Sequence, residues 1–543
     1  MDATVRFDTQ IVGALPVITN YFDRLEMAAT VDQLVPWEGD VPLGTLVEIL
    51  IANRLLQPKA LFRTGSWAEK AGLTDYYGVT ADQLNDDRLG RALERIAKHG
   101  ETVQVALVTQ VIKQFKLDVR QIHYDVTNVE LYGTYDRDDD HAPKGPLPAY
   151  GRTKSGRKNV KQIQAGLNVT SDGGVPVGHL PLDGNAAEAK THIENLRLLG
   201  RVLPKGELLY IADSKLDTPE NLLAIVARKG KFLCSGAFLP HLQEEFLKLR
   251  GQLQPVDYFP QSQAHLPEEE RDTYQAVEVA DTIEGTVDGR KVRMKYRKLF
   301  VWSEWKARQA ASTRERHATK IQEQFEMVQR NLGKYKLKTK EAILRRLEAA
   351  KAKYTEGTLF QYDLKEDRQG SFQLIWKINK QALTRLKKLE GVFVLKANLP
   401  KRSHPPAELL RTYGKQSNVE RRFHHLKGPL AVAPMFLEKP ERMAGLLYIL
   451  VWALMILALM ERQVRRNLRG KPLYGLYPEN RPSPAPTGPA LLDCFSTLCI
   501  VIVKHQGTTN RRLADPTSIQ RILLQLLNIP PNALRTFKRR CGM

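Results

Sequence analysis

Residues Gln121–Gly133, QIHYDVTNVELYG, are the stretch that decides the fold of this chain. Their apolar, β-branched and aromatic side chains predict a strand. Asp125 lies inside this strand, between Tyr124 and Val126. A buried carboxylate is costly unless it is paired or bound to a metal ion. Asp125 is therefore a candidate functional residue, and the alternative is an amphipathic strand that turns Asp125 toward water.

The residues that follow predict further strands and helices in alternation. Gln162–Leu182 has a hairpin turn signal at Asp172-Gly173-Gly174, and 186–200 is helical in pattern. GELLYIADSKL (206–216) and KFLCSG (231–236) predict two more strands. We therefore expect a mixed sheet covered by helices, an α/β domain, over residues 117–236.

Asp213 comes just after the buried part of the strand 206–216. Open sheets place their functional sites beyond such strand ends. The alternative role, capping the next helix, suits Asp217 or Thr218 better, since that helix starts near Pro219. Asp213 is the second candidate functional residue.

Upstream, residues 1–116 predict a helical N-terminal domain. LGTLVEILIANRLL (43–56) and the segment 88–115 have apolar residues at helical spacing, and Asn85-Asp86-Asp87 is a plausible cap for the second helix. The domain is either a plain helical scaffold or a DNA-end-binding or dimerisation domain, and no motif separates these alternatives.

Downstream, residues 237–406 combine strand-like pieces with a charged block, 305–354, that predicts a helical hairpin. We interpret this α+β region as an insertion between two halves of one domain, the second half being 407–470. A basic, proline-rich tail, 471–543, follows. No internal repeat is apparent.

A helix is predicted from Pro406 to a stop at Gly428-Pro429. Glu420 shares one face of it with three other polar residues, namely Tyr413, Gln416 and Lys427. An acid aligned with a tyrosine and a lysine can bind metal and phosphate together. A solvated face without function is the alternative, and it would be favoured if this helix stood alone.

The formal net charge of +22 favours a polyanionic partner: DNA, RNA or an acidic membrane surface. Four cysteines without metal-ligand spacing suggest reduced thiols in a cytosolic protein, and no secretory signal is evident. The apolar run Ala444–Met460 is barely long enough to span a bilayer. We favour a helix covered on all sides, with a single membrane span as the alternative.

Six blocks occur in order: HYDVTNVELYG, YGRTKSGRKNVKQ, PLDGNAAE, IADSKLDTPENL, GVFVLKANL and YGKQSNVERRFHHLKGPL. Together they resemble the DDE transposases of bacterial insertion sequences, in the large IS-four-like group and its IS-sixteen-thirty-four branch. The N-terminal stretch from Ile11 to Leu56 also resembles the front domain of that branch. The resemblance covers nearly the whole chain and is most specific from Gln121 to Leu459.

The resemblance implies an RNase H-like mixed-sheet catalytic domain, interrupted by the insertion and preceded by the helical domain. It implies that Asp125, Asp213 and Glu420 are the catalytic residues and the ligands of two Mg²⁺ ions, with Mn²⁺ able to substitute. Carboxylates suit Mg²⁺, and two such ions can activate a nucleophile and stabilise a leaving oxygen. Imidazole suits Mg²⁺ poorly, so we interpret His123, His424 and His425 as DNA-facing or structural.

The implied activity is cleavage at the element ends and transfer of the freed 3′-hydroxyl into target DNA. Expected partners are the terminal inverted repeats, the target DNA and a second copy in a synaptic homodimer, in the bacterial cytoplasm at the nucleoid, without a membrane. Alternatives are an inactive DNA-binding derivative and a nuclease without strand transfer. Gln416 stands where the family often has Arg, and Asn159 replaces a common acid. The expected DNA contacts are Arg152, Lys154, Arg157, Lys158, Lys161, Tyr413, Gln416 and Lys427.

Overall fold

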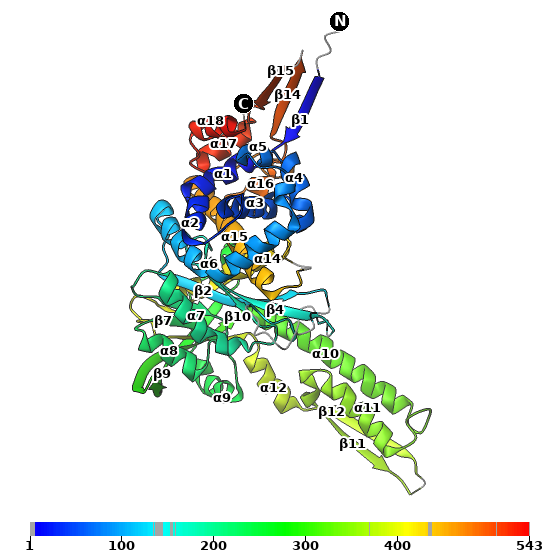
Figure 1. Ribbon diagram of the computed structural model, residues 1–543. Helices are drawn as coiled ribbons and strands as arrows, with labels where there is room; N and C mark the ends of the chain where they lie inside the picture. Colours follow the sequence, from blue (N-terminus) through cyan, green and yellow to red (C-terminus); the bar gives the residue numbers. More distant parts are fainter. Residues whose placement is uncertain are drawn as a thin grey trace. The chain divides into compact units, whose positions relative to one another are not determined.

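The structure is a computed structural model. It describes residues 6–133, 135, 145–151, 156–157, 159–368, 370–432, 437–505 and 508–541. The chain divides into two compact units: Met1–Phe232, Gly285–Val292 and Lys415–Met543 form the first, and Leu233–Glu284 with Arg293–Gly414 form the second. Both contain helices and strands, so the mixed α/β class expected from the sequence is confirmed (Figure 1).

The N-terminal part of the first unit is helical, as predicted. Its helices are α1 (Leu15–Arg24), α2 (Met27–Leu34), α3 (Leu43–Leu56), α4 (Thr64–Lys70), α5 (Leu73–Tyr77) and α6 (Asp86–Phe115), with 3-10 turns η1 (Leu61–Arg63) and η2 (Asp82–Leu84). The predicted cap is confirmed, because the Asn85 side chain accepts a hydrogen bond of 2.9 Å from the Arg88 amide. This bond satisfies one of the amides left unpaired at the start of α6.

The strands of the first unit's sheet are β2 (Gln121–Glu130), β3 (Ala149–Tyr150), β4 (Lys161–Thr170), β5 (Pro176–Leu182) and β6 (Leu209–Ala212). β2 pairs with β4 in antiparallel and with β6 in parallel orientation, and β4 also pairs with β3 and β5. Gly173 and Gly174 turn the β4–β5 hairpin with φ of 83° and 63°, a conformation that favours glycine. α7 (Glu188–Val202) and α8 (Pro219–Ala227) follow β5 and β6.

The apolar run forms α15 (Pro440–Leu468), which packs against α3, α6 and β5. It is the one helix of the described residues long and apolar enough to cross a membrane, and its most apolar window is entirely buried within the structure. The Trp452 indole inside it donates a hydrogen bond of 2.7 Å to Gln104 of α6. The covered helix favoured by the sequence is therefore what the structure contains.

The C-terminal part of the first unit contains α14 (Ser417–Lys427), η7 (Pro478–Asn480), α16 (Gly488–Asp493), α17 (Ser518–Leu526) and α18 (Pro531–Arg540). A small antiparallel sheet was not predicted. It joins β1 (Arg6–Ile11) to β14 (Cys499–His505), and β14 to β15 (Thr508–Leu513). A strand near the N-terminus thus shares one sheet with two strands of the C-terminal part (Figure 1).

The strands of the second unit are β7 (Lys231–Gly236), β8 (Gln254–Val256), β9 (Tyr274–Val287), β10 (Arg290–Ser303), β11 (Phe360–Glu366), β12 (Phe372–Ile378) and β13 (Val392–Ala397). Its helices are α9 (Pro240–Leu249), α10 (Glu304–Arg330), α11 (Lys340–Ala352), α12 (Lys380–Leu389) and α13 (Pro406–Gly414), with turns η3 (Arg250–Gln252), η4 (Gln261–Gln263), η5 (Glu268–Glu270) and η6 (Thr355–Leu359). The strands form a sheet in the order β7-β13-β10-β9-β8 and a two-stranded sheet of β11 and β12. The predicted helical hairpin is confirmed as α10 and α11, whose core includes Ile321, Phe325, Ile343 and Leu347.

Candidate functional site

The register of β2 and β6 places two of the candidate acids next to each other. Gln121 is opposite Leu209, and the pairing runs to Tyr124 opposite Ala212. The next residue in each segment is an aspartate, Asp125 on β2 and Asp213 directly after β6. Since neighbouring strands lie about 4.8 Å apart, the backbones of the two aspartates are adjacent.

Both aspartates belong to the face of the sheet that is turned away from α7. Successive side chains of a strand point to opposite faces. Tyr124 and Tyr210 point toward α7, where their hydroxyls hydrogen-bond to Thr191 and Asn195 at 3.0 and 2.9 Å. Asp125 follows Tyr124 by one residue and is half-buried, as is Asp213. Their carboxylates therefore lie on the opposite face.

The N-terminus of α14 docks on that opposite face. His123 precedes Asp125 by two residues, and its Nδ1 lies 2.9 Å from Oε1 of Gln416. The Gln416 amide nitrogen donates a hydrogen bond of 3.0 Å to the carbonyl of Tyr124. Glu420 follows Gln416 by four residues, which is about 6 Å along the helix and on nearly the same side of it. The backbone thus brings the third acid to the side of the sheet that holds the other two.

Arg422 fixes the rest of α14. Its guanidinium donates to the carbonyls of Gly174 and Gly173 at 2.7 and 2.8 Å, in the β4–β5 turn. It also forms an ion pair of 2.7 Å with Glu461 of α15, and the two side chains are 1% and 0% exposed. Glu420 itself is exposed. The helix is therefore held rigidly while its acid stays accessible to a ligand.

The three acids do not form a ready-made metal site. Among the described residues, no group of three or more His, Cys, Asp or Glu side chains is arranged to hold a metal ion. The donor set nevertheless fits Mg²⁺, which takes carboxylate oxygens and keeps several waters. Two of the carboxylates lie on adjacent strand positions, and the third stands on the docked helix. The assignment of Asp125, Asp213 and Glu420 as ligands stays a prediction.

The basic run beside β4 is described only in part. Arg152, Lys154 and Lys158 lie outside the described residues. Arg157 forms an ion pair of 3.4 Å with Glu130 at the end of β2, and its side chain is 59% exposed. Lys161 donates a hydrogen bond of 2.9 Å to the Tyr135 carbonyl. These two cations thus lie at the end of β2 beyond Asp125.

The single helix expected from Pro406 to Gly428 is in fact two helices. α13 ends at Gly414 and α14 begins at Ser417, so Tyr413 belongs to α13 in the second unit. Glycine is a weak helix former, and the Asn418 and Val419 amides bond three residues back, to Lys415 and Gln416. Lys427 is the exposed last residue of α14, directly before the predicted stop.

Gln416 was expected to contact DNA, but its side chain is buried inside the protein. It is 8% exposed, and both ends of its amide bond within the protein, to His123 and Tyr124. His123 is itself fully buried, which lowers its pKa to about 4 and keeps the ring neutral. The only indication of this buried pair, His123 and Gln416, in the sequence was a histidine inside an apolar strand.

Comparisons with known proteins give little more. Residues 7–111 match a family model described as "Domain of unknown function (DUF4277)", and no curated protein matches the chain. The chain is similar to the cryo-EM structure of a piggyBac transposase synaptic complex with hairpin DNA. The TM-score is 0.36 at 7% identity, over 98% of this chain and 87% of that chain. A similarity at this level fixes neither the fold family nor the function of this chain.

Proposed function

We propose that this protein is a DNA transposase of the DDE type, from the IS-four-like group and its IS-sixteen-thirty-four branch. It would cleave the ends of its own element and join the freed 3′-hydroxyl to target DNA. The observation that carries the proposal is the register that sets Asp125 beside Asp213, on the face of the sheet where α14 docks with Glu420. An RNase H-like architecture is supported by the same central strand, β2, paired with β4 on one side and β6 on the other.

In this proposal Asp125, Asp213 and Glu420 bind two Mg²⁺ ions, which Mn²⁺ can replace. When bound, the ions polarise the scissile phosphate and lower the pKa of the attacking water or hydroxyl. The protein's own residues position the reaction. His123 and Gln416 hold α14 against β2, and Arg422 ties it to the β4–β5 turn. Arg157 and Lys161 are proposed to contact DNA phosphates.

The proposed substrates are duplex DNA ends and target DNA, bound by a homodimer in the bacterial cytoplasm. The basic net charge of +22 supports a polyanionic substrate. Arg152, Lys154, Lys158, Tyr413 and Lys427 stay proposed DNA contacts. Gln416 is proposed as a positioning residue, because its amide is already used inside the protein.

The test uses duplex DNA that carries the inverted repeats flanking the coding segment, with Mg²⁺ present. Asp125→Asn, Asp213→Asn and Glu420→Gln should each slow cleavage by about a hundred-fold or more, because metal binding contributes several kcal/mol to such reactions. DNA binding should persist. Glu220→Gln, at an exposed acid of α8, is the matched control and should cleave normally.

Each other outcome has a meaning. Normal cleavage by any of the three acid variants would overturn the site. Metal-dependent cleavage without joined products would indicate a nuclease. A wild-type protein that binds the ends but never cleaves them would indicate an inactive derivative.

A further inference from the structure

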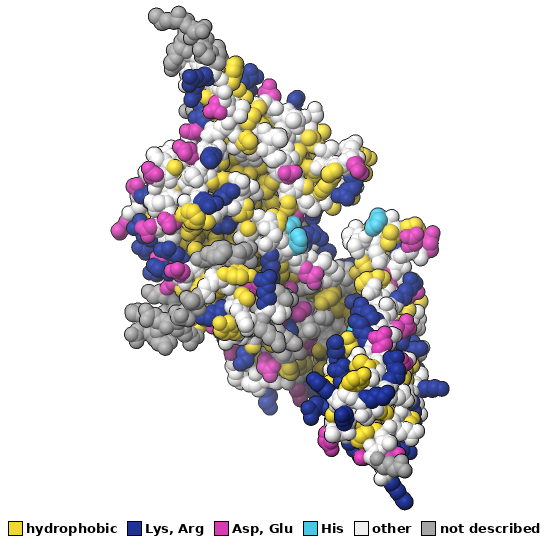
Figure 2. All heavy atoms as spheres, turned by 90° about the vertical axis from the view of Figure 1, so that its right-hand side faces the viewer, with side chains coloured by type: hydrophobic (Ala, Val, Ile, Leu, Met, Phe, Trp, Pro, Cys, Tyr) yellow, Lys and Arg dark blue, Asp and Glu magenta, His cyan; other side chains and the backbone are white. Residues whose placement is uncertain are grey.

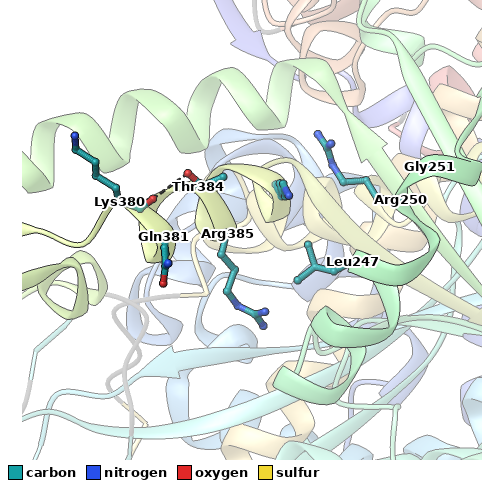
Figure 3. Close-up of a pocket in the computed structure, with 8 residues that line it drawn as sticks. Leu247, Arg250, Gly251, Lys380, Gln381, Thr384 and Arg385 are labelled. Carbon is teal, nitrogen blue, oxygen red and sulfur yellow. Dashed lines mark hydrogen bonds between the residues drawn. The ribbon is translucent and has the colours of Figure 1, made fainter.

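The second unit carries an open groove between α12 and the end of α9. Its volume is about 670 Å³. It is lined by Leu247, Arg250, Gly251, Lys380, Gln381, Thr384, Arg385 and Lys388. Figure 3 shows these side chains, which come from α12 on one side and from α9 and η3 on the other. Four of the eight lining residues are basic and none is acidic, so the groove presents positive charge.

Most of this charge is not neutralised by the protein. Glu244 holds the Arg385 guanidinium through both carboxylate oxygens. Arg250, Lys380 and Lys388 are exposed, and none of the three has an ion-pair partner in the described part of the chain. Figure 2 shows that Lys and Arg side chains are numerous on the surface of this unit around α10, α11 and β11. Unpaired cations in a hollow favour an anionic ligand.

The spacing of the cations favours a chain of phosphates over a single anion. Lys380 and Lys388 are eight residues apart on α12, which corresponds to about 12 Å along the helix axis. One phosphate hydrogen-bonds only to groups within about 3 Å of its oxygens. A nucleic-acid backbone instead presents successive charges, about 3.4 Å apart along the axis for each strand.

We propose that the α9–α12 groove binds the phosphate backbone of duplex DNA, with Arg250, Lys380 and Lys388 as the contacts. The choice of DNA rests on the proposed function. The proposed contact is independent of sequence, because phosphate oxygens are the same at every position of a duplex. The groove thus adds a second DNA contact, made by the inserted unit.

The experiment measures binding of the full-length protein to a short labelled DNA duplex, with EDTA present so that no cleavage occurs. The groove variant is Arg250→Glu with Lys388→Glu. The control variant is Lys248→Glu with Lys387→Glu, which makes the same charge change on the same two segments, at exposed residues outside the groove lining. Circular dichroism and thermal unfolding should be the same for both variants and the wild type.

The groove variant should bind at least about ten-fold more weakly than the control near 0.1 M salt. The plot of the logarithm of the binding constant against the logarithm of the salt concentration should also be less steep for the groove variant. The magnitude of its slope should be smaller by about 1 to 2, since each lost phosphate contact removes about 0.9. Equal affinity and slope for the two variants would overturn the groove contact. A groove variant that loses single-stranded RNA binding but keeps duplex binding would overturn it in favour of RNA.

Failure of the proposed function gives a different result. If the protein does not act on DNA at all, the wild type itself would bind neither the flanking repeats nor unrelated duplex. If it binds DNA without cleaving or joining it, the end-cleavage assay with Mg²⁺ reports that failure separately from the binding of the groove variant. If the wild type binds duplex DNA and the two variants bind it with equal affinity, the proposed function stands and only the proposed groove contact is rejected.

Discussion

Gln416 joins two segments of the chain through one amide group. Its oxygen faces the His123 ring and its nitrogen donates to the Tyr124 carbonyl, in a place that excludes water. A side chain with one acceptor and two donors can satisfy both partners at once, which an aliphatic side chain of similar size cannot. The position of α14, and with it the position of Glu420, depends on this residue.

Gln416→Leu should therefore cost about 1–3 kcal/mol of stability, because it leaves a buried ring nitrogen and a carbonyl unsatisfied. Cleavage should fall more than DNA binding does, since Glu420 would no longer be held. Thermal unfolding and end-cleavage assays measure the two effects. Arg421→Leu, an exposed change on the same helix, should alter stability by less than about 0.5 kcal/mol. An unchanged unfolding midpoint for Gln416→Leu would contradict this role.

His179 makes stability depend on pH. It is buried on β5 against the Tyr448 ring, and neither ring nitrogen has a hydrogen-bond partner among the described residues. Burial lowers its pKa from 6.5 to about 3 in the folded protein. Between those two values the unfolded chain binds a proton that the folded chain does not. Folding stability therefore decreases as the pH falls below about 6.5.

His179→Leu should remove this contribution. The wild type should lose up to about 2 kcal/mol between pH 6.5 and pH 5 through this residue, at about 1.4 kcal/mol for each pH unit. Unfolding midpoints of the variant should then fall less steeply with acid. His241→Leu, at an exposed residue of α9, is the control for replacing a histidine by a leucine. If the unfolding midpoints of His179→Leu and of the wild type fall equally with decreasing pH, His179 does not make this contribution.

At the scale of elements, α15 and α6 approach each other closely at a glycine. A β-carbon built on Gly445 would lie 2.0 Å from the backbone oxygen of Leu93. The helices can keep this distance only because Gly445 has no side chain. Trp452 and Gln104 then join the same two helices by a hydrogen bond.

Gly445→Ala should destabilise the first unit by about 1–3 kcal/mol, since α15 must shift to relieve the clash. Gly200→Ala is the matched control, because Gly200 is also helical and a β-carbon there meets nothing within 4 Å. The control should be neutral or stabilising by about 0.5–1 kcal/mol. Thermal unfolding of both proteins checks the prediction, and equal midpoints would refute it.

Local signals were sufficient for most elements. The Asn85 cap, the Gly173-Gly174 turn and the stop after Lys427 each depend on residues a few positions apart, and each is confirmed. The break between α13 and α14 was missed, because Gln416 bonds to residues of β2 almost 300 positions earlier. β1 was missed for a similar reason: its residue Thr9 pairs with Val501. Asp125 was selected as an acid inside an apolar strand and Asp213 as an acid at a strand end, and their joint role with Glu420 stays a prediction.

At the scale of the whole molecule, the first unit is assembled from segments at opposite ends of the sequence. β1 pairs with β14, and Arg511 of β15 forms an ion pair with Asp75 of α5. The apolar faces of α3 and α6 are covered by α15, and the second unit comes between α6 and α15 in the sequence. The core of the first unit therefore depends on contacts between residues that are several hundred positions apart.

This order of segments has a consequence during synthesis on the ribosome. Phe115 ends α6 and Pro440 begins α15, so 325 residues must be added to reach even the first residue of the covering helix. At roughly 5–20 residues per second, that takes roughly 15–65 s. For that time the apolar surfaces of the early helices have no native partner, and such surfaces attract chaperones or aggregate. The yield of native protein in a cell should therefore depend more on chaperone supply and translation speed than on the final stability of the fold.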